Sequence, residues 1–238
     1  MVRSLLFTKD RWNPGKVIPW EIVKEKWSKD WDYDKLVLLE KSPPHLVRAK
    51  QLEMHFPQSY FIIMIRNPYA FCESVKRRWG NKPSFFRRFS YFNIAKFWVI
   101  CAHYQVFNIK HLQNAMYFSY EELTHHPRQI CQRILDFVPE LGALDPERKF
   151  IVSEKHMKIK DLNETQIRRL SDNDTFEINE ILKEYPALLN FFNYQYEEPS
   201  RNIKFKTPKR VYMRVRSLNR LPNPVMWQNW KKLPRGNY

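Results

Sequence analysis

Two cations in the first third of the chain stand where an α/β protein binds anions. Lys41 follows the apolar run of residues 36–40, and Arg66 follows a second apolar run, residues 60–65. Both runs are typical of buried strands in a parallel sheet, and open α/β sheets bind ligands just beyond the carboxyl ends of their strands. Because a guanidinium binds a phosphate through parallel hydrogen bonds, the arginine indicates a phosphate ester.

A serine and a second arginine follow Arg66 at helical spacing. Pro68 is tolerated at the start of a helix, and the pattern predicts a helix over 69–79 that carries Ser74 and Arg78. These two residues are four apart, so they share a helix face. The serine hydroxyl adds a neutral donor and Arg78 a further positive charge. The order of strand, arginine and serine-bearing helix therefore predicts one anion pocket for Arg66 and Ser74.

Hydrophobic periodicity and capping signals place the elements around this pocket. Ser171 and Asp174 have the spacing of a capping box, which predicts a helix that runs to about residue 185. Residues 1–35 are expected to be helical or irregular, 81–89 a basic loop, and 141–163 irregular. The remaining predicted elements are helices over 44–56, 91–112 and 127–138, a third strand over 116–120, and a short turn over 187–193.

Composition limits the class of partner. The net charge is +16, and no Asp or Glu occurs from residue 74 to 120 or from 199 to 238. Such basic blocks favour phosphate, sulfate, nucleic acid or anionic lipid.

The only Gly-Lys pair, Gly15-Lys16, lacks the rest of a Walker A loop. The three cysteines show no metal or disulfide spacing, and neither a signal peptide nor a long apolar span is evident, so a cytoplasmic location is expected.

Three blocks, in order, resemble the nucleotide-binding half of sulfotransferases that use 3′-phosphoadenosine 5′-phosphosulfate (PAPS). They read EKSPPHL…FPQSYFIIMIRNPYAFCES, YFSYEELTHHPRQICQRILDFV and IRRLSDNDTFEINEILKEYPALLNFFNY. The likeness covers about residues 36–196, and it is closest to bacterial members and to the protein-tyrosine and carbohydrate branches. It implies an α/β fold like that of P-loop NTPases, with a parallel sheet flanked by helices. The domain would span 36–196, after the 1–35 lead-in and before a basic, proline-containing tail at 197–238.

The resemblance also implies roles for individual residues. Arg66 and Ser74 match the pair that binds the 3′-phosphate of PAPS, and Arg78 matches a further arginine on the phosphate side. Tyr120 matches a tyrosine near the nucleotide, and Lys41 matches a catalytic lysine near the transferring sulfuryl group. The co-substrate would be PAPS, with no metal required. The acceptor hydroxyl or amine, on a carbohydrate, a protein tyrosine or a small molecule, is not specified by the sequence.

The chain departs from the family pattern at its amino-terminal side. Sulfotransferases of this type have a PRSGTT-like loop that binds the 5′-phosphosulfate, upstream of the segment that matches Lys41. No residues here match that loop. Pro43 stands where the cytosolic branch has a histidine. An N-terminally truncated domain, weakly active or inactive by itself, is therefore expected. The alternatives are a non-catalytic nucleotide-binding or interaction module of the same fold and, less favoured, a basic nucleic-acid-binding protein.

Overall fold

The structure is a computed structural model that describes residues 12–80, 90–152 and 155–198 of the 238-residue chain. Two of the predicted segments fall largely outside these ranges. They are the basic loop at 81–89 and the tail at 197–238, of which only the first two residues are described. The fold below is that of the described residues.

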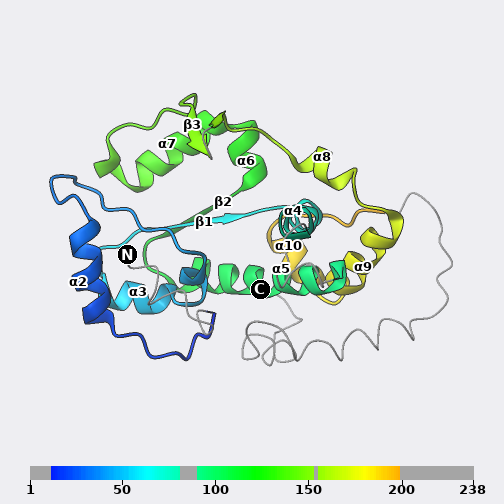
Figure 1. Cartoon of the computed structure of the whole chain (residues 1–238), viewed down its shortest axis with the longest axis horizontal. Coiled ribbons are helices and arrows are strands. Elements are labelled where there is room, and N and C mark those ends of the chain that lie inside the picture. The colour runs from blue at the N-terminus through cyan, green and yellow to red at the C-terminus, as the bar shows by residue number, and fades with distance from the viewer. Residues whose placement is uncertain (1–11, 81–89, 153–154, 199–238) are drawn as a thin grey trace.

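A small parallel sheet forms the centre of the fold. Strand β1 (Phe61–Ile65) pairs with β2 (Ala115–Ser119) in the register Phe61↔Ala115 to Ile65↔Ser119. Between them the chain forms α4 (Pro68–Gly80) and α5 (Tyr91–His111). Helix α5 lies on one side of the sheet, and α6 (Tyr120–His125) and α7 (Pro127–Phe137) lie on the other (Figure 1). The described part is thus an α/β fold rich in helix, as the sequence predicted for these elements.

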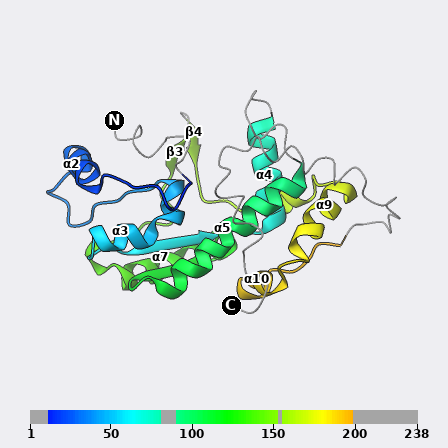
Figure 2. The same ribbon diagram turned by 90° about the horizontal axis from the view of Figure 1, so that it is seen from below.

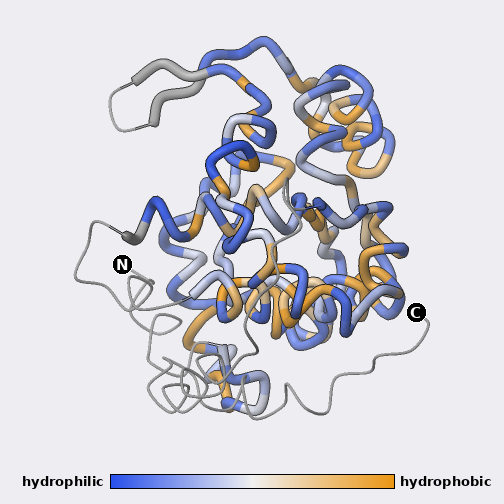
Figure 3. Tube along the Cα trace, turned by 90° about the vertical axis from the view of Figure 1, so that its right-hand side faces the viewer, coloured by the Kyte–Doolittle hydropathy of each residue, from blue (hydrophilic) through white to orange (hydrophobic). Residues whose placement is uncertain are grey.

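Helix α5 is the core of the molecule. Figure 2 shows it crossing the middle of the view, and α9 (Asp172–Leu182) and α10 (Pro186–Phe191) pack against it. Hydrophobic stretches gather in the lower centre of Figure 3, and hydrophilic segments lie toward the outside. The capping box at the start of α9 forms as predicted, because the Ser171 hydroxyl accepts from Asp174 N and the Asp174 carboxylate accepts from Ser171 N. Fully buried members of the core include Tyr69, Ile94, Ile100, Ile178, Ile181, Leu182, Tyr185 and Leu188.

A second apolar cluster joins the amino-terminal helix to α3. Helix α2 (Trp20–Asp30) packs through Trp20, Val23 and Trp27 on Leu52 of α3 (Ala49–His55). The Trp27 ring stacks on Phe56 with 5.6 Å between centroids. The predicted helix over 44–56 is broken in two, because a 3₁₀ helix η1 (Pro43–Val47) precedes α3. Its two leading prolines have no N–H to donate, which matches their place in a first turn.

The predicted strand at residues 36–40 is wrong. These residues form no strand, and Leu36 and Leu39 are 87% and 83% exposed. A continuous apolar run indicates burial but does not specify a ladder partner, and β1 has β2 as its one partner among the described residues. The lack of a strand at residues 36–40 also affects the burial of β1. Ile62 and Met64 are exposed, whereas the sequence predicted a strand buried on both faces.

The segment after α7 contains more structure than the sequence indicated. Residues 141–163 were expected to be irregular, but β3 (Phe150–Val152) and β4 (Lys155–Met157) form an antiparallel pair. A short 3₁₀ helix η3 (Pro139–Leu141) precedes them, and α8 (Asn163–Ile167) follows. Strands of three residues lie below the length at which alternation can be recognised in a sequence. This segment brings α8 back toward the carboxyl end of β1.

All three cysteines are free thiols. Cys72 is buried and Cys101 half-buried, and burial raises the pKa of Cys101 to about 12. Among the described residues, no three His, Cys, Asp or Glu side chains gather as a metal ion would require. Within the same ranges, every helix is too short or too polar to span a bilayer.

Acid should destabilise the fold through His103 of α5. This histidine is buried against the Tyr185 ring, and burial lowers its pKa to about 4. Below pH of about 6.5 the unfolded chain takes up a proton that the folded protein does not bind until about pH 4. The free energy of unfolding is therefore expected to fall by up to about 3 kcal/mol between those pH values. Urea unfolding across that range would measure the slope, and His103→Leu should flatten it. An equally steep slope in the variant would contradict the assignment.

Candidate functional site

Arg66 stands at the corner where β1 ends and α4 begins. The next residue, Asn67, caps the helix, because its side-chain Oδ1 accepts from the backbone N–H groups of Tyr69 (2.9 Å) and Ala70 (3.1 Å). Pro68 then begins α4 without a donor to satisfy. The backbone carbonyl of Arg66 accepts from Trp98 Nε1 of α5 at 2.9 Å. The Arg-Asn-Pro order thus aims one side chain outward from a rigid strand-to-helix turn.

The Arg66 guanidinium is held by neutral groups. Its Nε donates to Asn163 Oδ1 at 2.9 Å and its Nη2 to Gln166 Oε1 at 2.7 Å. The ring of Tyr120 lies under it, 4.0 Å from Cζ to the centroid. The side chain is half-buried, and no carboxylate among the described residues comes within ion-pair distance of it. The guanidinium is therefore held in a fixed orientation by groups that carry no charge.

Glu121 organises the groups around this arginine. Its Oε1 accepts from the backbone N–H of Asn67 at 3.0 Å and from the side-chain amide of Asn163. Its Oε2 accepts from the hydroxyl of Tyr194 at 2.8 Å. Burial, and the neighbouring Glu121 carboxylate, raise the pKa of Tyr194, so this hydroxyl remains a donor. One carboxylate thus ties together the β1–α4 corner, α8 and the chain after α10.

Residues 160–162, which lead into α8, are fastened to α6. The Tyr120 hydroxyl donates to the Lys160 carbonyl at 2.6 Å, and His125 Nε2 lies 2.9 Å from Asp161 Oδ2. The other oxygen of Asp161 accepts from Asn163 N at 2.8 Å. Helix α8 also packs along α4. These contacts hold the two amide side chains of α8 against Arg66.

The structure brings together two of the five predicted site residues, Arg66 and Tyr120. Ser74 and Arg78 lie on α4, half-buried and exposed respectively, and no hydrogen bond or ion pair joins either of them to Arg66 within the described ranges. Glu73 beside Ser74 is buried, and its charge is balanced by Arg77 at 3.3 Å and Arg169 at 3.5 Å. The acidic side chain on α4 therefore does not offset the charge of Arg66.

Lys41 is exposed on the corner between residue 40 and η1, and no described residue pairs with it. Its neighbour Glu40 accepts from Ser42 Oγ at 2.9 Å and lies 3.1 Å from His45 Nε2. Burial lowers the pKa of His45, opposed by Glu40. The other ring nitrogen is buried without a hydrogen-bond partner in the described structure. Neither nitrogen of His45 is thus open to an acceptor hydroxyl in the described structure.

Several residues that build the site carry no signal in the sequence. Asn163 lies 97 positions and Gln166 lies 100 positions after Arg66 in the chain, and neither belongs to a local motif. Glu121 stands beside the predicted Tyr120, between the capping-box residues Ser119 and Glu122, and no motif marks it. Trp98 carried no signal beyond its place in an amphipathic helix. Pairing of this kind can be recognised only once the fold brings the elements together.

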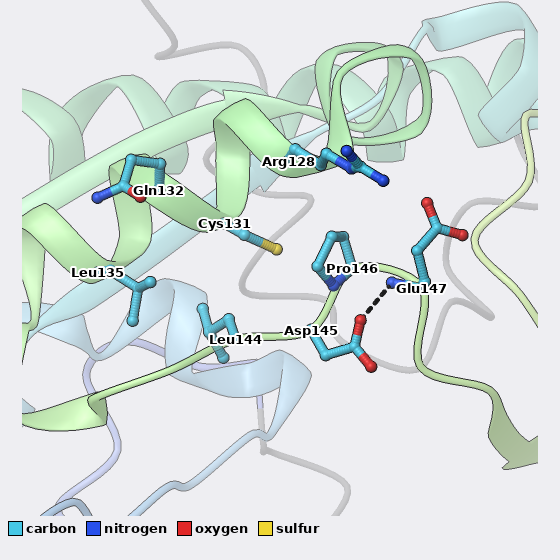
Figure 4. Close-up of a pocket in the computed structure, with 8 residues that line it drawn as sticks. All are labelled: Arg128, Cys131, Gln132, Leu135, Leu144, Asp145, Pro146 and Glu147. Carbon is cyan, nitrogen blue, oxygen red and sulfur yellow. Dashed lines mark hydrogen bonds between the residues drawn. The ribbon is translucent and has the colours of Figure 1, made fainter.

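A hollow of about 320 Å³ lies elsewhere, between α7 and the loop that follows it. Figure 4 shows Cys131 and Arg128 from the helix facing Pro146 and Glu147 from the loop. Burial, and the nearby Asp145 carboxylate, raise the pKa of Cys131, which disfavours its thiolate. None of the predicted site residues lines this hollow, and its charges are of both signs. The candidate site remains the Arg66 corner.

Comparison with known proteins supports the same region. A family model described as "Sulfotransferase family" matches residues 20–140, slightly more than half of the chain. No curated protein and no solved structure matches it. The matched residues include Lys41, Arg66, Ser74, Arg78 and Tyr120, whereas Asn163 and Gln166 lie beyond them. The chain, with its arginine corner at the end of a parallel strand, belongs to the sulfotransferase family.

Proposed function

We propose that this sulfotransferase-family chain binds PAPS and that Arg66 holds the 3′-phosphate of the nucleotide. The observation that carries the proposal is the half-buried guanidinium whose bonding partners are amide oxygens and an aromatic ring. A cation held in a partly desolvated place, with no described carboxylate at ion-pair distance, can still gain from a directly bound anion. A phosphate monoester supplies the missing negative charge and can accept parallel N–H bonds from the guanidinium.

The neighbouring residues have supporting roles in this proposal. Ser74 would add a hydroxyl donor to the same phosphate, and Arg78, on the same face of α4, a second cation. The Tyr120 ring would keep its place beneath Arg66 and border the nucleotide. Burial raises the pKa of Tyr120, opposed by the Arg66 charge, so the hydroxyl stays protonated and bonded to the Lys160 carbonyl.

The reaction would be the transfer of a sulfuryl group from PAPS to a hydroxyl or amine acceptor. Such transfer is expected to resemble phosphoryl transfer, with in-line attack and negative charge spreading over the peripheral oxygens. Fixed cations stabilise that charge, and Lys41 at the corner after residue 40 is proposed for this role. The acceptor would be a carbohydrate, a protein tyrosine or a small molecule.

Titration calorimetry with two nucleotides tests the proposal. Adenosine 3′,5′-bisphosphate and adenosine 5′-monophosphate differ only in the 3′-phosphate that Arg66 is proposed to bind. Two charge-assisted bonds from the guanidinium, each contributing about 1.5–3 kcal/mol, correspond to a Kd ratio of about 10² to about 10⁴ in favour of the bisphosphate. Equal affinities for the two nucleotides would contradict a 3′-phosphate site. A steep loss of binding with salt for any polynucleotide would instead favour a nucleic-acid-binding protein.

A further inference from the structure

The partners of the Arg66 guanidinium are unusual in having no charge. A buried or half-buried arginine most often pairs with a carboxylate, yet here two amide oxygens take that place, from Asn163 and Gln166. Both amide side chains are buried, at 7% and 2% exposure. They belong to one short helix, α8, which packs along α4. The arrangement orients Arg66 without neutralising it.

The orientation of the Asn163 amide is fixed by its neighbours. This side chain lies between Arg66, which can only donate, and the Glu121 carboxylate, which can only accept. The amide oxygen therefore faces Arg66 and the amide nitrogen faces Glu121. The reverse orientation would set two donors against each other on one side and two acceptors on the other. Glu121 is itself held by Asn67 N and the Tyr194 hydroxyl, so the geometry is determined over two layers of contacts.

We propose that Asn163 and Gln166 are positioning residues that adapt Arg66 to a dianionic phosphate, an inference that rests on the proposed function. They engage Nε and one N–H of Nη2 and leave the remaining N–H groups of the fork for the ligand. A carboxylate at either position would compete with the phosphate for the same charge. An amide supplies the same directional hydrogen bond at no electrostatic cost to the ligand. The Arg66 side chain is thus preorganised, so that little further conformational entropy is lost when the ligand binds.

Gln166 allows a sharp test, because two substitutions of similar shape separate charge from packing. Gln166→Glu places a carboxylate on Nη2, and Gln166→Met removes the acceptor without adding charge. Gln113→Glu is the matched control, since this exposed glutamine precedes β2, at the opposite end of the strands from Arg66. The melting temperature of each free protein shows whether it folds.

The expected results concern the Kd for adenosine 3′,5′-bisphosphate measured by calorimetry. Gln166→Glu should raise it at least about tenfold, because a unit charge within hydrogen-bond distance strongly offsets the guanidinium. Gln166→Met should raise it about three- to tenfold through lost orientation. The control should leave it unchanged. Adenosine 5′-monophosphate should bind all four proteins with similar affinity, a split that general damage to the fold would not produce.

Two results would overturn the inference. Either folded Gln166 variant binding the bisphosphate as tightly as the wild type would show that α8 does not position Arg66. Parallel losses for both nucleotides would assign Gln166 a purely structural role. A wild-type protein that fails to prefer the bisphosphate would instead refute the proposed function itself, and the inference with it, before any variant is compared.

Discussion

Arg66→Ala is expected to weaken adenosine 3′,5′-bisphosphate binding by about 100-fold or more. The free N–H groups of the guanidinium can make two charge-assisted bonds to the 3′-phosphate, each contributing about 1.5–3 kcal/mol. Losing both corresponds to a factor of about 10² to about 10⁴ in Kd. Alanine also leaves the buried oxygens of Asn163 and Gln166 without their donors, which should lower the stability of the free protein.

Two variants separate the geometry of Arg66 from its charge. Arg66→Lys keeps the charge but not the planar fork, so it should recover only part of the affinity. Arg168→Ala removes an equal charge just after α8, from an exposed ion pair with Glu164, and should change the Kd less than about threefold. Calorimetry gives the affinities, and thermal unfolding of the free proteins confirms that they fold. If Arg168→Ala costs as much as Arg66→Ala, the binding is diffuse and electrostatic rather than a defined phosphate site.

The part of the site that a sequence can predict is the part encoded locally. The order of strand, Arg66, capping Asn67 and Pro68 occupies eight residues, and the structure confirms both the strand and the helix that it predicted. The same holds for the Ser171 capping box. The two helix starts depend on hydrogen bonds within a few positions, which residue types specify directly.

What the sequence did not predict depends on contacts between distant segments. The apolar run at 36–40 has the composition of a strand, but a strand also needs a partner, and none of the described residues provides one. Asn163, Gln166 and Glu121 carry ordinary polar side chains with no distinctive spacing. Their importance comes from a meeting of α8, α6 and the end of β1, and only the three-dimensional arrangement reveals it.

Trp98→Ala should have the largest effect on stability, because Trp98 joins the core to the site. The indole is 2% exposed in the α5 core, packs edge-on against Tyr194, and donates to the Arg66 carbonyl. Truncation creates a large cavity and removes that donor, so the free energy of unfolding should fall by about 3–5 kcal/mol. Trp98→Phe fills most of the space but lacks the N–H, and should cost about 1–3 kcal/mol.

Urea unfolding of the three proteins measures these differences, with Phe107→Ala as the control. Phe107 lies on the same helix but is exposed, so its truncation should cost less than about 1 kcal/mol. If Trp98→Phe proves as stable as the wild type, the indole N–H contributes nothing to the stability of the β1–α4 corner. If Trp98→Ala costs no more than Phe107→Ala, then α5 does not pack on the end of β1 as described, and the orientation of Arg66 would need another source.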